Sequence, residues 1–240
     1  MTNIYSITPR DDATEKIESY IIDNNLKPHT RIPSEREMCK MWDCNRSTLR
    51  SAIKRLIAEG KLYSVMGSGT FVAEPKLVRN LQDLVPVSDL AREMGKTFSG
   101  KVISKQIIES TKQLSQKLHL PIGHKIFELI RLRLLDDIPV TVETIYVDAQ
   151  RFKGLTKYNF DELSFYEILS QEYNVEIQKG WEKIGITYAT EFEAELLNIE
   201  VASPLFFLSG VASDAEDNPI EYSKSVVKSE EIRFASQLTR

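Results

Sequence analysis

The stretch IPSEREMCKMWDCNRSTLRSAIKRLIAEGKLYSVMGSGTF, residues 32–71, decides the fold of the N-terminal part of the chain. It holds two short helical patterns in succession, and a hairpin with glycines at its tip follows directly. Ser34 and Glu37 have the three-residue spacing of a capping box, in which each side chain bonds the other's backbone N–H. This spacing predicts a helix that starts after Ser34 and runs to about Trp42.

The second helical pattern can begin at Asn45 or at Ser47, because either side chain can cap a helix. Gly60 ends it. Apolar residues recur at helical spacing within it and form a stripe that faces the core; they are Leu49, Ile53, Leu56 and Ile57. The segments 61–65 and 69–74 then read as two short strands around the tip at residues 66–69.

A further helix is expected before this stretch, over residues 11–24, where apolar residues recur at helical spacing behind an acidic first turn. The resulting order is three helices and a hairpin. This order is that of a winged helix-turn-helix domain, which we place at residues 1–75.

Cations mark one edge of the last helix. Arg46, Arg50 and Lys54 follow one another at intervals of four residues, and no acidic residue occurs between Asp43 and Glu59. A solvated helix surface has the same pattern. However, such a helix can also enter the major groove of DNA, and the small residues of the hairpin tip allow a close approach of the backbone to another surface. Together the two features favour DNA binding.

The segments IPSERE, NRSTLRSAIKRLIAEGKLY and GSGTFV, in this order, resemble the DNA-binding domain of the GntR family of bacterial transcription regulators over residues 5–73. Asn45 stands where that family usually has serine or threonine, and all three residue types cap helices. The resemblance implies double-stranded operator DNA as a partner. It also implies DNA contacts, with Ser47 on a phosphate and Gly67 as the wing glycine, for this set: Arg36, Arg46, Ser47, Thr48, Arg50, Gly67 and Gly69.

The composition sets limits on the rest of the chain. Of 240 residues, 42% are hydrophobic and 28% charged, which is typical of a water-soluble protein with a proper core. No apolar run has the length of a membrane span, and the first residues lack the pattern of a signal peptide, so we expect a cytoplasmic protein and no membrane partner. Cys39 and Cys44 are expected to be reduced thiols that pack between helices. The three histidines show no metal-ligand spacing, so neither a metal nor a cofactor is predicted.

The net charge of −4 hides an asymmetry. Residues 31–61 contain eight Lys or Arg against four acidic residues, whereas residues 76–240 contain twenty against twenty-five. A basic module is therefore joined to an acidic one, which is typical of a nucleic-acid-binding domain attached to a domain of different function.

The pattern changes along the second module. Residues 74–97 contain two prolines and no strand pattern, so residues 76–97 are interpreted as a linker with a helical turn around Asp89 to Met94. Residues 98–240 alternate apolar and polar positions in six segments, with short helical segments between them. We expect an α+β domain with a mostly antiparallel sheet. The strands expected are 100–110, 125–135, 139–148, 181–189, 204–213 and 220–228.

Arg131 and Arg133 are two residues apart, so they share one face of their strand. Two cations on a half-buried strand are costly unless an anion pairs with them, and Glu143 on the next strand can do so. One interpretation is a structural ion pair near a sheet edge. The other is a pocket for a phosphate or carboxylate, which guanidinium groups bind well. Backbone N–H groups at a helix start at Ser164 would add to such a pocket.

Glu221 could accept hydrogen bonds from ligand hydroxyls or could be a solvent-facing acid in a hairpin. The segments RLRLLDDIPVTVET, SFYEIL and NPIEYSKS resemble the UTRA effector domain of the HutC-type GntR subfamily over residues 95–238. In sugar-phosphate sensors of that subfamily, the matching residues bind the phosphate or the sugar hydroxyls. The resemblance thus implies a small anionic effector, such as a sugar phosphate, bound by Ser88, Arg131, Arg133, Glu143, Ser164, Tyr166 and Glu221.

One departure from the family concerns Val227, which stands where many members have tyrosine and cannot donate a hydrogen bond. The nonphosphate part of the ligand is therefore expected to differ. The resemblance implies a ligand-responsive regulator, a repressor that binds as a homodimer. Two alternatives stay open: an enzyme similar to chorismate lyase, whose fold the UTRA domain resembles, and a regulator with a vestigial pocket.

Overall fold

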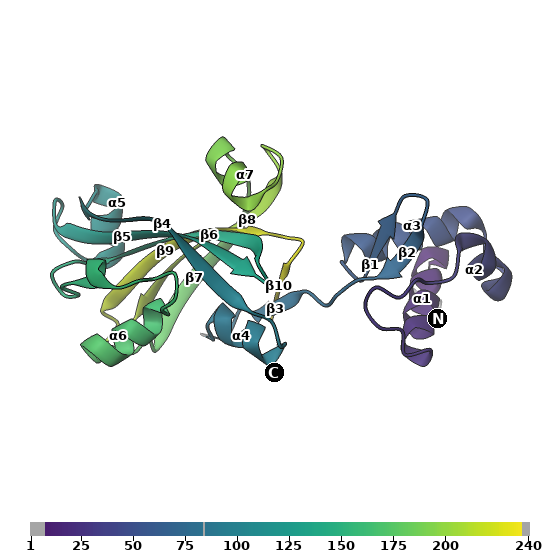
Figure 1. Cartoon of the computed structure of the whole chain (residues 1–240), viewed down its shortest axis with the longest axis horizontal. Helices are drawn as coiled ribbons and strands as arrows, with labels where there is room; N and C mark the ends of the chain where they lie inside the picture. The colour runs from purple at the N-terminus through teal and green to yellow at the C-terminus, as the bar shows by residue number, and fades with distance from the viewer. Residues whose placement is uncertain (1–7, 84, 237–240) are drawn as a thin grey trace, which may run out of the picture. The chain divides into compact units, whose positions relative to one another are not determined.

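The computed structural model describes residues 8–83 and 85–236, and the chain divides into two compact units, residues 1–76 and 77–240 (Figure 1). The first unit contains three helices and a two-stranded hairpin, which confirms the predicted winged helix-turn-helix. The elements are α1 (Pro9–Asp23), α2 (Glu35–Trp42), α3 (Arg46–Ala58), β1 (Leu62–Val65) and β2 (Gly69–Val72).

The predicted capping box is present at α2. The Ser34 side chain accepts from the backbone N–H of Glu37, and the Glu37 carboxylate accepts from the backbone N–H of Ser34 at 2.7 Å. Asn45 caps α3 by accepting from the backbone N–H of Thr48 at 2.8 Å, so of the two possible caps it is Asn45 that begins this helix. Cys39 is a free thiol, partly buried against the core of the unit, and so is Cys44.

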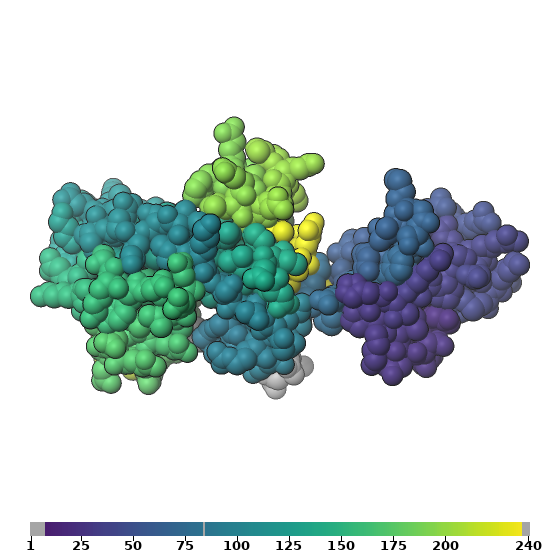
Figure 2. Space-filling model, in the orientation of Figure 1, coloured from purple at the N-terminus to yellow at the C-terminus, as the bar shows by residue number. Residues whose placement is uncertain are grey.

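The hairpin β1–β2 forms the wing. Its strands pair antiparallel, and Met66 at the tip is fully exposed. The tip protrudes from the surface of this unit (Figure 2). Behind it, the buried face of α3 packs on α1 and the hairpin. Of the predicted stripe, Leu49, Ile53 and Leu56 are buried and Ile57 is partly buried.

The second unit is built on a six-stranded antiparallel sheet in the order β4-β5-β6-β9-β8-β7. All six predicted strands are present within two residues of their expected bounds. Together with the helices, they confirm the α+β class. The strands are β4 (Phe98–Glu109), β5 (Lys125–Leu135), β6 (Ile138–Asp148), β7 (Lys179–Tyr188), β8 (Pro204–Ser213) and β9 (Pro219–Lys228).

Both faces of this sheet are covered (Figure 1). One face packs against α5 (Lys112–Leu118) and α7 (Glu191–Leu197). The other face packs against α6 (Phe165–Tyr173) at one end and against a small assembly at the other. That assembly contains β3 (Leu77–Asn80), α4 (Val87–Glu93) and β10 (Ile232–Ala235); a short 3-10 helix, η1 (Leu155–Lys157), adjoins α6.

The expectation that residues 74–97 contain no strand is wrong. Residues 77–80 form β3, which pairs in parallel with β10 near the other end of the chain. A four-residue strand has too few positions to show alternation, and its partner is remote in sequence, so the local pattern carries no signal. The expected linker 76–97 therefore holds β3 and α4, and both contribute to the core of the second unit.

A tight turn fixes the register of β5 and β6. Asp136 and Asp137 have φ values of 49° and 64°, the left-handed conformation at both central positions that suits a two-residue hairpin. The turn pairs Leu135 with Ile138, and a bulge between Arg133 and Leu134 then shifts the register by one residue, so that Arg131 faces Glu143 and Arg133 faces Thr141. No helix of the described part of the chain is both long and apolar enough to span a membrane.

Candidate functional site

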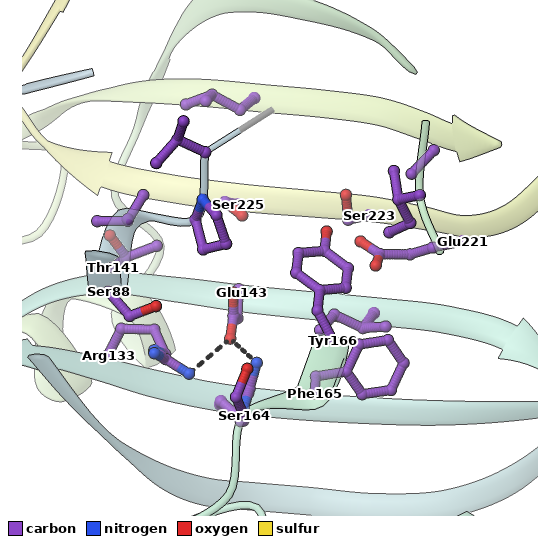
Figure 3. Close-up of a pocket in the computed structure, with 18 of the residues that line it drawn as sticks. Ser88, Arg133, Thr141, Glu143, Ser164, Phe165, Tyr166, Glu221, Ser223 and Ser225 are labelled. Carbon is purple, nitrogen blue, oxygen red and sulfur yellow. Dashed lines mark ion pairs between the residues drawn. The ribbon is translucent and has the colours of Figure 1, made fainter. Parts of the chain in front are cut away.

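A cavity of about 450 Å³ lies on the face of the sheet between α6 and the β3–α4–β10 assembly (Figure 3). Inward-facing residues of β5, β6 and β9 line it from the sheet. Residues of α4, of the start of α6 and of β3 and β10 line it from the covering side. The cavity therefore forms where two separate covering elements meet on one sheet face.

Two arginines and one carboxylate lie at one end of the cavity. Arg131 is only 4% exposed, and its Nη2 lies 2.6 Å from Oε1 of Glu143. The Nη1 atom of Arg133 lies 3.5 Å from the same oxygen. Oε1 of Glu143 has no hydrogen-bond partner among the described residues, so both contacts are ion pairs held by charge. The expected pairing with Glu143 is confirmed, and the carboxylate serves both cations.

One carboxylate does not satisfy these arginines. Among the described residues, Nε and Nη1 of Arg131 and Nε of Arg133 are buried and have no hydrogen-bond partner. Burial, with a contribution from the charge of Arg131, lowers the pKa of Arg133, while Glu143 opposes that shift. The Arg133 guanidinium also lies over the Phe98 ring, 4.5 Å from its centroid. Two cations thus lie beside one carboxylate, and some of their buried N–H donors have no acceptor. This end of the cavity is therefore suited to an anionic ligand group.

Hydroxyl groups complete this end. Ser164 caps α6, where its Oγ accepts from the backbone N–H of Glu167 at 3.4 Å. Ser88 lines the cavity from the first turn of α4. Figure 3 shows both serines on the same side as Arg133 and Glu143. The helix start predicted at Ser164 is thus present beside the arginines.

A second carboxylate lies deeper in the cavity. Glu221 is 2% exposed, and its Oε2 has no hydrogen-bond partner among the described residues. Burial raises the pKa of Glu221 to about 7, against the opposing effect of hydrogen bonds from Ser223 and Tyr166. The alternative that Glu221 is a solvent-facing hairpin acid is therefore wrong. Its neighbourhood is polar enough to hold a carboxyl group and dry enough to keep it partly protonated near neutral pH.

Tyr166 joins Glu221 to the helix. The residue as a whole is 37% exposed, but its phenol end lies in the cavity beside Glu221 and Ser223 (Figure 3). Burial of that end, and secondarily the Glu221 carboxylate, raises the pKa of Tyr166 well above 10. The phenol thus stays protonated and can donate a hydrogen bond.

The cavity brings together all of the effector-binding residues that the resemblance implied. These are Ser88, Arg131, Arg133, Glu143, Ser164, Tyr166 and Glu221. Sequence reasoning missed several others that line the same cavity: Arg79, Thr141, Glu182, Ser223 and Ser225.

Alternation along strands could have found three of the missed residues. Thr141 is two positions from Glu143 on β6, and Ser223 and Ser225 continue the face of Glu221 on β9. Val227 also lies on that face, 3% exposed and opposite Thr141. The valine that stands in place of the family's usual tyrosine therefore forms part of the cavity wall. Among the described residues, no group of three or more His, Cys, Asp or Glu side chains could hold a metal ion.

The first unit presents the residues expected to contact DNA. Arg36, Arg46 and Ser47 are exposed, and Thr48 is partly buried. Arg50 is exposed too, but it forms a two-point ion pair with Glu35 of α2, with Nε and Nη2 at 3.1 and 2.8 Å from the two carboxylate oxygens. Arg50 must therefore share or release this carboxylate to contact a phosphate or a base.

The wing glycines differ from each other. Gly67 has a φ of 76° and an added Cβ would meet nothing within 4 Å, so its backbone is open to an approaching surface. Gly69 has a φ of 131°, and an added Cβ would lie 2.6 Å from Nε of Arg31. Gly69 is thus required chiefly by its backbone conformation, because the Arg31 side chain could move aside, whereas the surroundings of Gly67 at the tip are open.

Comparisons with known protein families agree with this geometry. The model of the UTRA domain matches residues 93–233, and the model described as "Bacterial regulatory proteins, gntR family" matches residues 9–72. The chain is 28% identical to the HTH-type transcriptional repressor NagR of Bacillus subtilis (strain 168), over 94% of this chain and 93% of NagR. It is 30% identical to the HTH-type transcriptional regulator YurK of the same organism, over 86% of each chain.

A solved structure shows the same fold. The crystal structure of PhnF from Mycobacterium smegmatis superposes with a TM-score of 0.71 at 22% identity, covering 95% of this chain and 99% of PhnF. The relatives named here are all transcriptional regulators. The chain therefore belongs to the GntR family of bacterial regulatory proteins, in the HutC-type group that joins a winged helix-turn-helix domain to a UTRA domain.

Proposed function

We propose that this protein is a transcriptional repressor that binds operator DNA as a homodimer and responds to a small anionic metabolite. The ligand binds in the cavity of the second unit, and its binding changes the affinity of the first unit for the operator. Such coupling is a shift between two conformations of different operator affinity and requires no chemical reaction.

One observation carries this proposal. The buried N–H groups of Arg131 and Arg133 that lack a partner point to a ligand that supplies acceptors. A buried donor without a partner costs about 1–3 kcal/mol, so a cavity that had lost its function would have little reason to keep these groups. This cost argues against a vestigial pocket. A phosphate or carboxylate would satisfy the donors and balance the excess positive charge beside Glu143.

The rest of the cavity suggests the remainder of the ligand. Glu143 and Glu221 offer acceptors to hydroxyl groups, and Ser223 and Ser225 offer both donors and acceptors. Val227 makes part of the wall apolar. The volume of about 450 Å³ lies within the range that small-molecule sites occupy. A sugar phosphate fits this combination, with its phosphate at the arginines and its hydroxyls toward Glu221.

The sheet edges support a dimer through the second unit. A second chain can extend a sheet at an edge whose backbone groups are unpaired. The outer edge of β4 is partly covered, because the backbone N–H of Val102 donates to Asp161 and Nζ of Lys105 donates to the carbonyl of Tyr158. β4 also contains a bulge near residue 103, which discourages pairing.

The opposite edge strand, β7, is unprotected. Among the described residues, no strand pairs with its outer side, and its ten residues are exposed or partly exposed. Trp181, Ile184, Ile186 and Tyr188 add exposed apolar surface. We expect β7 of one copy to pair antiparallel with β7 of the other, and we expect residues 77–240 to dimerise without the first unit.

Sedimentation velocity of the full chain tests the dimer. The protein should sediment at about twice 27.5 kDa, and Ile186→Pro, which removes one β7 N–H and cannot continue a ladder, should shift it to monomer. Ile138→Ser, at another exposed apolar side chain of the same unit, should leave the dimer intact. A monomeric native protein at micromolar concentration would refute the dimer.

Binding experiments test the DNA and ligand parts. Duplexes selected from a random library with the native protein would supply an operator, and fluorescence anisotropy would give its affinity. Calorimetry with a panel of sugar phosphates and carboxylates, run on the native protein and on Arg133→Ala, would then identify the ligand class. Binding of anions to the native protein alone supports the proposal. Failure to select any duplex would overturn the DNA-binding part.

A further inference from the structure

Arg79 lines the cavity from a strand that lies outside the main sheet. Its side chain extends from β3, and both Nη atoms lie 3.1 Å from Oε1 of Glu182 on β7. The guanidinium carbon also lies 5.9 Å from the centroid of the Phe234 ring on β10. Arg79 and Glu182 both line the cavity, at the end formed by β7 rather than by the arginines of β5.

The contact joins two separate sheets. β3 pairs with β10, and the described strands of this pair form no ladder with the six-stranded sheet. Apolar packing of Leu77 and Ile232 against Leu208 and Val227 holds the pair against the sheet. Such packing has no direction, whereas a two-donor ion pair fixes one position. Arg79 and Glu182 therefore set where β3 lies over the cavity.

The location of β3 in the chain gives this contact a functional meaning. β3 begins at Leu77, which is the first residue of the second unit, and Lys76 is the last residue of the DNA-binding unit. After β3 the chain continues to α4, which carries Ser88 into the cavity. Whatever moves β3 thus moves the attachment point of the DNA-binding unit.

We propose that the Arg79–Glu182 ion pair is a latch that couples cavity occupancy to operator affinity. The latch is closed in the structure described here. A ligand that extends through the cavity to β7 places a polar group against Arg79 or Glu182 and so replaces the other partner of the ion pair. The latch then opens, and β3 and β10 shift together. This inference rests on the proposed function, because it assigns the step by which the same cavity acts on the same DNA-binding unit.

The latch can be opened without a ligand, which makes the test independent of ligand identity. Arg79→Gln and Glu182→Gln each remove one charge. The double variant Arg79→Glu/Glu182→Arg restores an ion pair of reversed polarity. Arg151→Gln is a matched control, because it breaks the ion pair of Arg151 with Asp214 (3.3 Å) in the same unit, and neither residue lines the cavity.

Operator affinity is then measured by fluorescence anisotropy on the ligand-free full-length proteins. Only variants whose Tm lies within a few degrees of that of the native protein are compared. Both single variants should change operator affinity about fivefold or more in the same direction. The reversed pair should return to within twofold of the native value, and Arg151→Gln should match the native protein.

The possible failures are distinguishable. If the native protein binds its selected operator and the single variants bind it equally well, the latch is wrong and the proposed function stands. Single variants that change affinity in opposite directions would also overturn the latch. If the native protein binds no selected duplex, the proposed function itself fails.

Discussion

Arg131 and Glu143 face each other across the β5–β6 ladder, with Nη2 of the arginine 2.6 Å from Oε1 of the carboxylate in the buried end of the cavity. Arg133 approaches the same oxygen at 3.5 Å. One carboxylate thus holds two like charges together. Without it, the two guanidinium groups would repel each other in a medium that screens charge poorly.

Glu143→Gln should therefore destabilise the second unit. Removing one partner of a buried ion pair leaves an uncompensated charge, and we expect a loss of about 3 kcal/mol in the free energy of unfolding. Sulfate should restore more stability to this variant than to the native protein, because the anion replaces the carboxylate. Urea unfolding with and without sulfate measures both effects. Glu128→Gln, on the opposite face of β5, should cost less than about 1 kcal/mol; an equal loss in both variants would contradict the account.

Glu221 should make stability depend on pH. Burial raises its pKa to about 7 in the folded protein, from 4.5. Between these values the folded state binds more protons than the unfolded state, so the contribution of Glu221 to stability falls as pH rises through this window. The difference in unfolding free energy, native minus Glu221→Gln, should drop by roughly 3 kcal/mol between pH 4.5 and 8. A difference that does not vary with pH would show that Glu221 has the same pKa in the folded and the unfolded protein and would contradict this prediction.

Two variants of the DNA-binding unit should change operator affinity in opposite directions. Arg46→Ala should weaken operator binding and leave the fold intact; if Arg46 makes a bidentate base contact, discrimination falls by about 1–3 kcal/mol. Glu35→Gln should strengthen binding, because it frees Arg50 and removes a negative charge near the phosphates. Anisotropy with operator and random duplexes separates base contacts from phosphate contacts. Weaker binding by Glu35→Gln would contradict a DNA contact of Arg50.

Gly67→Ala tests the wing. The left-handed backbone at Gly67 makes alanine cost about 1 kcal/mol of stability, and no packing is disturbed. If the tip enters a groove, operator affinity should fall by more than this strain explains. Gly95→Ala is the matched control, because Gly95 has a φ of 71°, equally open surroundings and a place in the other unit. Equal operator affinity for the two variants would remove the wing tip from the DNA interface.

The sequence predicted the parts of this structure whose signals are local. The capping box of Ser34 and Glu37 depends on four adjacent residues, and the six strands each show alternation over eight residues or more. The two-residue turn at Asp136 and Asp137 is also a local signal, but the bulge between Arg133 and Leu134 that completes the register of Arg131 with Glu143 was not predicted. The family resemblance then pointed to the cavity residues, and those on β5, β6 and β9 lie together because these strands are neighbours in the sheet.

The parts that sequence reasoning missed depend on contacts between distant segments. β3 is recognisable only through its pairing with β10, and Arg79 only through its contact with Glu182 on β7. The pairing of Arg50 with Glu35 joins two helices and has no local spacing. The sequence pattern does not show whether Glu221 is buried, because a polar residue on a strand gives the same pattern whether its face is covered by another element or by water.

The most direct test of the central claim is operator affinity as a function of ligand concentration for the native protein and for Arg133→Ala. With an anionic ligand found by calorimetry, the native protein should change its operator affinity on saturation. Arg133→Ala should bind ligand-free operator with the native affinity. To reach the same change in operator affinity, it should need a higher ligand concentration, by a factor that corresponds to about 1.5–3 kcal/mol, the strength of one lost charge-assisted contact. Identical titrations of the two proteins would show that the arginines serve only the fold and would contradict the account.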